Sequence, residues 1–157
     1  MISVAELHPG TFTAIFAKLA EEGRIRGRIA LEPVAKAIEK QAKINASTGR
    51  HKYGTPTPAQ PGTGPASISG TLRRSITHAA AVQNGTGWEM KVGTGVGFTP
   101  PYGGGRTPAN KYGYYLEHGL RNGSTYPFLV PAFNFAVKHV APQIYRAAYG
   151  TGWKRVD

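Results

Sequence analysis

The sequence predicts an α+β fold, with N-terminal helices, an antiparallel sheet of three or four strands, a C-terminal helix packed on the sheet, and long Gly/Pro-rich loops. Three observations predict it. A helical apolar stripe runs through residues 29–46, a hairpin pattern centres on Asn84-Gly85, and a second helical stripe follows Pro131. The 157 residues suffice for a single domain with its own core.

Residues 1–46 are predicted to be the helical part of this domain. Ile2 and Val4 alternate as in an edge strand within a short leader. A first helix is predicted from Thr11 towards Gly23, because the apolar residues there recur at i, i+3, i+4 and i+7 (Phe12, Ile15, Phe16 and Leu19).

A second helix is predicted over about residues 29–46. Glu32 and Pro33 are assigned to its first turn, where an acid meets the positive end of the helix dipole and proline is tolerated. Its apolar residues share one stripe (Leu31, Val34, Ala35, Ile38 and Ala42). Two i, i+4 ion pairs are expected, Glu32–Lys36 and Glu39–Lys43. We interpret the lysines, with Lys40, as a solvated helix face.

Residues 47–70 are predicted to be a flexible loop. They are rich in proline and glycine and almost lack large apolar residues, so they cannot bury enough surface to fold alone. Arg50 and Lys52 give this loop basic charge. A loop this long within a domain is usually functional or disordered. An arm that docks on a neighbour and a solvated surface loop are both open interpretations.

The antiparallel sheet is predicted within residues 71–130. Residues 72–76 are either a short helical turn or the start of a strand. Asn84-Gly85 is a hairpin turn signal. Apolar residues alternate on both sides of it (Ile76, Ala80, Val82, then Trp88, Met90, Val92). An isolated hairpin is only marginally stable, so it must pack on the helices. A second Gly/Pro-rich loop is predicted at residues 93–111.

Residues 112–133 hold four of the eight tyrosines. Residues 112–116 are predicted to be a short aromatic strand or a helical turn that ends at His118-Gly119, since glycine takes positive φ at no steric cost. Pro131 suits the first turn of a last helix at 131–149. We expect Pro142 to kink this helix and Gly150 to end it. Its apolar face is predicted from helical spacing (Ala132, Phe135, Ala136, His139, Val140 and Ile144).

The composition limits the classes of function. The net charge of +11 favours contact with a polyanion or an acidic partner, although a solvated basic face is an equal alternative. Without cysteine the chain forms no disulfides and performs no thiol chemistry, which fits a reducing cytosol. No apolar run approaches the roughly 20 residues that span a bilayer, and residues 1–10 do not resemble a signal peptide.

Candidate catalytic groups are few, and the sequence predicts no enzyme, no metal and no cofactor. The five histidines lack metal-ligand spacing. The glycine-rich residues 93–97 lack the Gly-Lys-Ser/Thr ending of a phosphate-binding loop. Glu117 is either a catalytic base or the partner of an arginine across a subunit boundary, and we favour the second. The tyrosines could stack on nucleic-acid bases, but an interface or core role is the safer interpretation.

Two sequence blocks resemble the tail-component family of long-tailed bacteriophages, which comprises small neck and tail-completion proteins. The first block, residues 70–76 (GTLRRSI), is similar to that family's G-x-LR-x-SI. The second is similar to its YA-x-x-x-E-x-G…PF-L-x-PA signature (Tyr114, Tyr115, Glu117, Gly119, Pro127, Phe128, Leu129, Pro131 and Ala132). The blocks occur in the family's order after a helix. One departure is Leu120, where the family has threonine, which predicts a different local turn.

The resemblance implies a virion structural protein of the head–tail junction, a neck, tail-completion or tail-terminator component assembled in the host cytoplasm. It would form an oligomeric ring around the DNA channel, with no membrane. Its partners would be its own copies, an adjacent connector or stopper ring, tail tube proteins and the genomic DNA in the lumen. The alternative is a basic nucleic-acid-binding module, which would bind free duplex DNA in a salt-dependent way.

The resemblance also implies roles for particular residues. One set is fold-defining or lies at an interface (Tyr114, Tyr115, Glu117, Gly119, Pro127, Phe128 and Pro131). A basic set is inter-subunit or DNA-facing (Arg73, Arg74, Arg50 and Lys52).

Overall fold

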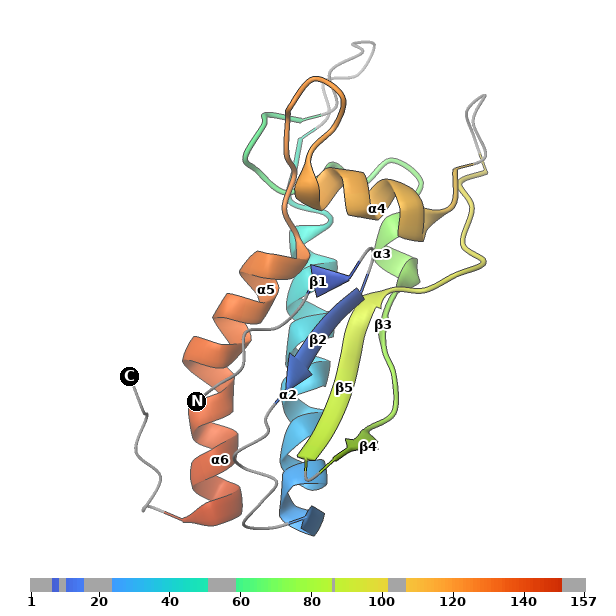
Figure 1. The fold of residues 1–157 in the computed structure, drawn as a ribbon. Helices are drawn as coiled ribbons and strands as arrows, with labels where there is room; N and C mark the ends of the chain where they lie inside the picture. Colours follow the sequence, from blue (N-terminus) through green and yellow to red (C-terminus); the bar gives the residue numbers. More distant parts are fainter. Residues whose placement is uncertain are drawn as a thin grey trace.

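A computed structural model of the chain describes residues 7–8, 11–15, 24–50, 59–85, 87–101 and 107–150. Helices and an antiparallel sheet occur together, so the α+β fold class is confirmed (Figure 1). The elements are, in chain order, β1 (Leu7–His8), β2 (Thr11–Ile15), α2 (Arg24–Asn45), α3 (Thr71–Ser75), β3 (Ile76–His78), β4 (Val82–Asn84), β5 (Gly87–Thr94), α4 (Ala109–His118), α5 (Leu129–Phe135), the π-helical segment η1 (Ala136–Val140) and α6 (Ala141–Tyr149).

Strand β5 is the centre of the sheet. It pairs on one side with β2, which pairs with β1, and on the other side with β3 and β4, and every pairing is antiparallel. The predicted hairpin is confirmed, because Asn84 pairs with Gly87 across the turn and Gly85 has a φ of 59°. Met90 and Val92 are buried on the face of β5 that packs against α2.

The first predicted helix is wrong where the structure describes it. Residues Thr11–Ile15 form strand β2, whose register with β5 runs from Thr11 opposite Gly93 to Ile15 opposite Glu89. The Thr-Phe-Thr-Ala-Ile segment contains β-branched and aromatic residues that favour a pleated strand. Residues 16–23 and the alternation of Ile2 and Val4 lie outside the described residues.

Helix α2 confirms the second predicted helix but begins earlier, at Arg24. Pro33 therefore lies inside the helix and not in its first turn. The predicted stripe is buried (Leu31, Val34, Ala35, Ile38 and Ala42). Both predicted ion pairs are present, Glu32 with Lys36 and Glu39 with Lys43. α2 contacts the sheet as well as α5, η1 and α6, so it joins the C-terminal helices to the sheet (Figure 1).

The C-terminal helix is confirmed, and it contains a π-helical turn next to Pro142, where the sequence predicts a kink. A π-helical turn, η1, precedes Pro142, which stands in the first turn of α6. Proline cannot donate a backbone hydrogen bond, and a π-turn accommodates such a local irregularity. Of the predicted apolar face, Ala132 and Ala136 are buried, whereas Phe135 is 42% exposed and lies at a tilt against the ring of the exposed His139.

Of the two predicted Gly/Pro-rich loops, only the second differs from its predicted bounds in the described residues. The second is shorter, because residues 93–94 belong to β5 and residues 109–111 belong to α4. The described part of the first, residues 59–70, runs beside the end of α2, where Gly49 and Ala66 form a parallel bridge. A Cβ on Gly64 would stand 2.2 Å from the Asn45 carbonyl oxygen, so this close approach requires glycine.

Candidate functional site

The two sequence blocks that carry the family resemblance meet in space. α3, within the first block, packs against α4, which leads into the second. Gly113 lies at this contact, and a Cβ there would stand 3.1 Å from Leu72 Cδ1, 3.2 Å from Thr94 Cγ2 and 3.6 Å from Phe128 Cζ. Absence of a Cβ lets α4 approach this closely. Leu72 and Phe128 are both buried, so the two blocks form one packed unit.

Glu117 caps the N-terminus of α5. Its Oε2 accepts the backbone N–H groups of Phe128 at 2.8 Å and Leu129 at 3.0 Å, and its Oε1 accepts that of Val130 at 2.9 Å. The first N–H groups of a helix have no partner within the helix and carry the positive end of its dipole. A carboxylate is therefore well suited to this position. Neither role predicted for Glu117, a catalytic base or an intersubunit ion pair, anticipated this cap.

The loop from α4 to α5 is fixed at both ends. Gly119 ends α4 with a φ of 131°, in the region that favours glycine, as the sequence predicts. The Tyr126 N–H donates to the Leu116 carbonyl at 2.6 Å. Asn45, the last residue of α2, donates through Nδ2 to the Phe128 carbonyl at 3.1 Å. The capped start of α5 is thereby held against α4 and α2 together. Residues 112–116, predicted as strand or helical turn, are helical.

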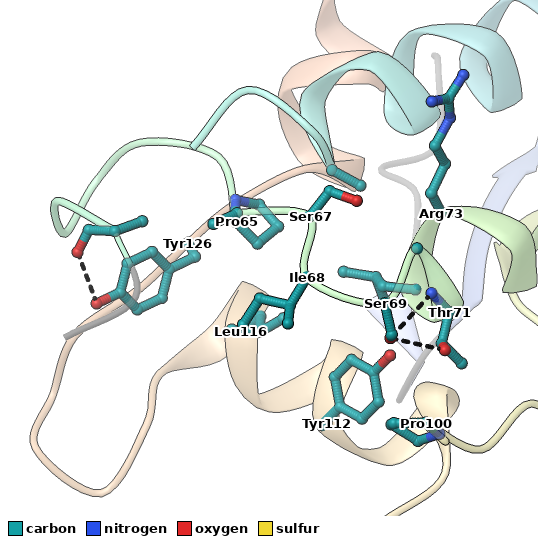
Figure 2. A pocket seen from close by; sticks show the side chains of 15 residues that line it. Pro65, Ser67, Ile68, Ser69, Thr71, Arg73, Pro100, Tyr112, Leu116 and Tyr126 are labelled. Atoms are coloured by element: carbon teal, nitrogen blue, oxygen red, sulfur yellow. Dashed lines mark hydrogen bonds between the residues drawn. The ribbon is translucent and has the colours of Figure 1, made fainter. Parts of the chain in front are cut away.

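Residues 59–70 lie over this unit beside an apolar cavity of about 330 Å³. The buried Tyr126 donates its hydroxyl to the Ala59 carbonyl at 3.3 Å, and the Gly62 N–H donates to the Thr125 carbonyl at 2.8 Å. These bonds join segments that lie far apart in the sequence. Figure 2 shows the side chains that face the cavity, most of them apolar (Pro65, Ile68, Pro100, Tyr112, Leu116 and Tyr126).

Tyr112 contributes a phenol to this cavity. Burial raises the pKa of Tyr112 above its ordinary value, against the opposing effect of the Arg74 charge. The phenol is therefore neutral at physiological pH and presents a hydroxyl at the wall of the cavity.

The predicted interface residues divide into an inner and an outer group. Phe128 is fully buried and the Glu117 carboxylate caps the N-terminus of α5, so both residues define the fold. Tyr115 is 43% exposed and meets the Tyr114 ring edge-on at 5.7 Å, while Tyr114 stacks on His118 at 4.4 Å. These three aromatic side chains form an outward cluster on α4. Of the two predicted prolines, Pro127 is half-buried and Pro131 is exposed.

The predicted basic residues are not gathered in one place. Arg73 and Arg74 are exposed on α3, Arg50 is exposed beyond the end of α2, and Lys52 lies outside the described residues. Of the three that the structure describes, only Arg73 lines a larger charged surface, a groove between α2, α3 and β3 that we call the basic groove (Lys36, Glu39, Lys40, Lys43, Ile44, Arg73 and His78).

Sequence reasoning missed the lysines of the basic groove as functional candidates. They were interpreted as a solvated face of α2. Their recurrence at i, i+4 and i+7 (Lys36, Lys40 and Lys43) was the available signal, because this spacing places three like charges on one side of a helix.

The described ranges hold neither a metal-binding cluster nor a membrane-spanning helix. No group of three or more His, Cys, Asp or Glu side chains there could hold a metal ion. None of the helices described is both long enough and apolar enough to cross a bilayer. The chain matches no protein-family model, no curated protein and no solved structure. Function is therefore inferred from the two sequence blocks and the geometry that they form.

Proposed function

We propose that the protein is a virion structural component of the head–tail junction of a long-tailed bacteriophage. It acts as one subunit of an oligomeric ring around the DNA channel, in the neck or as a tail-completion or tail-terminator protein. Its work is assembly, with no chemical step. Its partners are its own copies, the neighbouring connector or stopper ring and the proteins of the tail tube.

One observation carries this proposal: the two blocks that resemble the family converge on a single packed unit. Leu72 of the first block meets Gly113 of α4, and Glu117 of the second block caps the helix that begins beside Phe128. The signature residues thus set the positions of α3, α4 and α5 relative to one another. The contacts described here give these signature residues structural roles, which are the roles that an assembly protein requires of them.

The outer surface of the same unit offers contacts for assembly. Tyr114, Tyr115 and His118 present aromatic rings on α4, and large amphipathic side chains of this kind are enriched in protein interfaces. Ile68, 71% exposed, lies at the rim of the apolar cavity. Two different surfaces that bind head to tail generate a closed ring when the rotation between subunits closes.

The experiment that tests this function removes the protein from the phage that encodes it. Particles are purified with and without the gene and imaged by electron microscopy. Filled heads and normal tails that fail to join would place the protein in the neck, and tails of uncontrolled length would make it the terminator. Intact infectious particles without the protein would refute the proposal. A variant carrying Tyr115→Ala should reproduce the assembly defect while remaining folded, whereas Tyr115→Phe should restore joining.

A further inference from the structure

The basic groove concentrates positive charge on a concave surface. Lys36, Lys40 and Lys43 line it from α2, and Arg73 faces them from α3. Glu39 is the only carboxylate in the lining. Four cationic side chains meet one carboxylate in the lining, and Glu32 beside it pairs with Lys36, so an excess of two positive charges remains when His78 is neutral. Such an excess repels itself unless an anion enters the groove.

The charges within the groove are not equally neutralised by the chain itself. Glu39 binds Lys43 and also accepts a bond from His78 Nδ1 at 2.5 Å. Burial raises the pKa of Glu39, but the hydrogen bonds from Lys43 and His78 outweigh it, so the net pKa is lowered and Glu39 is ionised at neutral pH. Lys40 and Arg73, by contrast, have no ion-pair partner in the part of the chain that the structure describes.

Lys36 is also available to a ligand. Its ion pair with Glu32, at 2.7 Å, joins two side chains that are each more than half exposed. Exposed pairs of this kind contribute little and exchange readily for another anion. Lys36, Lys40 and Arg73 are therefore three cationic groups that a bound anion can engage.

We propose that the basic groove binds the phosphate backbone of duplex DNA, which on the proposed function is the genome passing through the ring. The helical rise places Lys36 and Lys43 about 10 Å apart along α2. Over that length, one strand of duplex DNA presents about three phosphates. The row of lysines spans several phosphates of one strand without matching them one to one, and Arg73 adds a contact from the opposite wall.

The residue types in the groove favour duplex DNA over other anions. Its lining contains no Phe, Tyr or Trp, and the ring of its one histidine, His78, is bound to Glu39, so it offers little on which unpaired bases could stack. Lysine is depleted and aromatic residues are enriched in protein interfaces, which argues against an acidic protein as the occupant. Lysine and arginine without base contacts are typical of backbone recognition, which carries no sequence specificity.

The test measures how salt affects the binding of the full chain to a fluorescent 30-base-pair duplex, by anisotropy between 50 and 200 mM NaCl. The groove variant is Lys40→Gln with Arg73→Gln. The matched control is Lys138→Gln with Arg146→Gln, which removes the same charge from exposed positions on the C-terminal helices. Each phosphate contact contributes about −0.9 to the slope of log K against log [salt]. We expect the groove variant to flatten the slope by about 1.8, and the control by less than half as much.

Equal effects of the two variants would overturn the proposal, because binding would then follow net charge and not the groove. Polyglutamate that competes as well as duplex DNA of equal charge would also overturn it and indicate an acidic protein partner. The assay uses free protein and free DNA, so it can fail while the particle-joining experiment succeeds. Conversely, the groove could bind DNA while heads and tails join without the protein. That result would refute the ring function and leave the DNA-binding proposal standing.

Discussion

The Glu117 cap makes a quantitative prediction about stability. Glu117→Ala removes three hydrogen bonds of 2.8, 3.0 and 2.9 Å from the start of α5. Loss of a side-chain cap costs about 0.5–2 kcal/mol, and hydrogen bonds to a charged acceptor are worth about 1.5–3 kcal/mol each. Glu117 is half-buried, so water replaces part of what is lost. We expect the free energy of unfolding to fall by about 2–3 kcal/mol.

Urea denaturation followed by circular dichroism measures this change. For a domain of this size, about 2–3 kcal/mol corresponds to a drop in Tm of roughly 5–10 °C. Glu117→Gln keeps one oxygen acceptor and should lose about half as much stability. Glu32→Ala is the control, because Glu32 is an exposed glutamate on α2 whose removal should leave the midpoint unchanged.

Two outcomes would contradict the cap. If Glu117→Ala is as stable as Glu32→Ala, the three bonds contribute nothing measurable. If its stability is unchanged but the assembled ring is lost, Glu117 acts at a subunit boundary and not within its own chain. Hydrogen exchange at Phe128, Leu129 and Val130 separates these cases, because only loss of the cap accelerates exchange of these amides in the isolated protein.

Three further predictions concern the same packed unit and the adjoining groove. Gly113→Ala should destabilise the fold by about 1–2 kcal/mol, because the added methyl overlaps neighbouring side chains. Stabilisation by up to about 1 kcal/mol, as at an open helical position, would show that the contact is loose. Tyr126→Phe should cost about 0.5–1 kcal/mol and speed exchange in residues 59–66, since it removes the buried bond to Ala59; unchanged exchange would argue against that anchor. Glu39→Gln should cost about 1 kcal/mol at neutral pH. Because the folded-state pKa of Glu39 is lowered from 4.5, its contribution is present above that pH and lost as pH falls through the lower folded value; a difference between wild type and variant that persists at pH 2 would contradict this.

The sequence predicted the elements whose signals are local. The apolar stripe of α2 and the Asn84-Gly85 turn each lie within one continuous segment, and both are present in the structure. The same holds for Gly119, where positive φ ends α4. Periodicity and turn chemistry are properties of neighbouring residues, so they can be recognised without the fold.

The N-terminal strand could not be predicted in this way. Phe12 and Ile15 fit a helical stripe, yet residues 11–15 also contain residues that favour a strand. The choice between them is made by β5, which supplies the pairing partner from residues 89–93. A pairing partner so distant in the chain leaves no trace in the local pattern.

The candidate site was predicted in its residues but not in their roles. An N-terminal capping box has its acid within three residues of the cap, whereas Glu117 reaches α5 from the preceding helix. Local spacing therefore gave no signal for the cap. The basic groove was missed for a similar reason, because Arg73 joins Lys36 and Lys40 only when α3 packs beside α2.

The most direct measurement of the proposed function is a cryo-electron microscopy reconstruction of the head–tail junction in intact particles. We predict a ring of copies of this α+β fold around the channel, with α2 and the C-terminal helices recognisable in each subunit. The basic groove should face the lumen, and the α4 aromatic cluster should lie at a subunit contact. A junction fully explained by other proteins, with this chain absent from the purified particles by mass spectrometry, would contradict the proposed function.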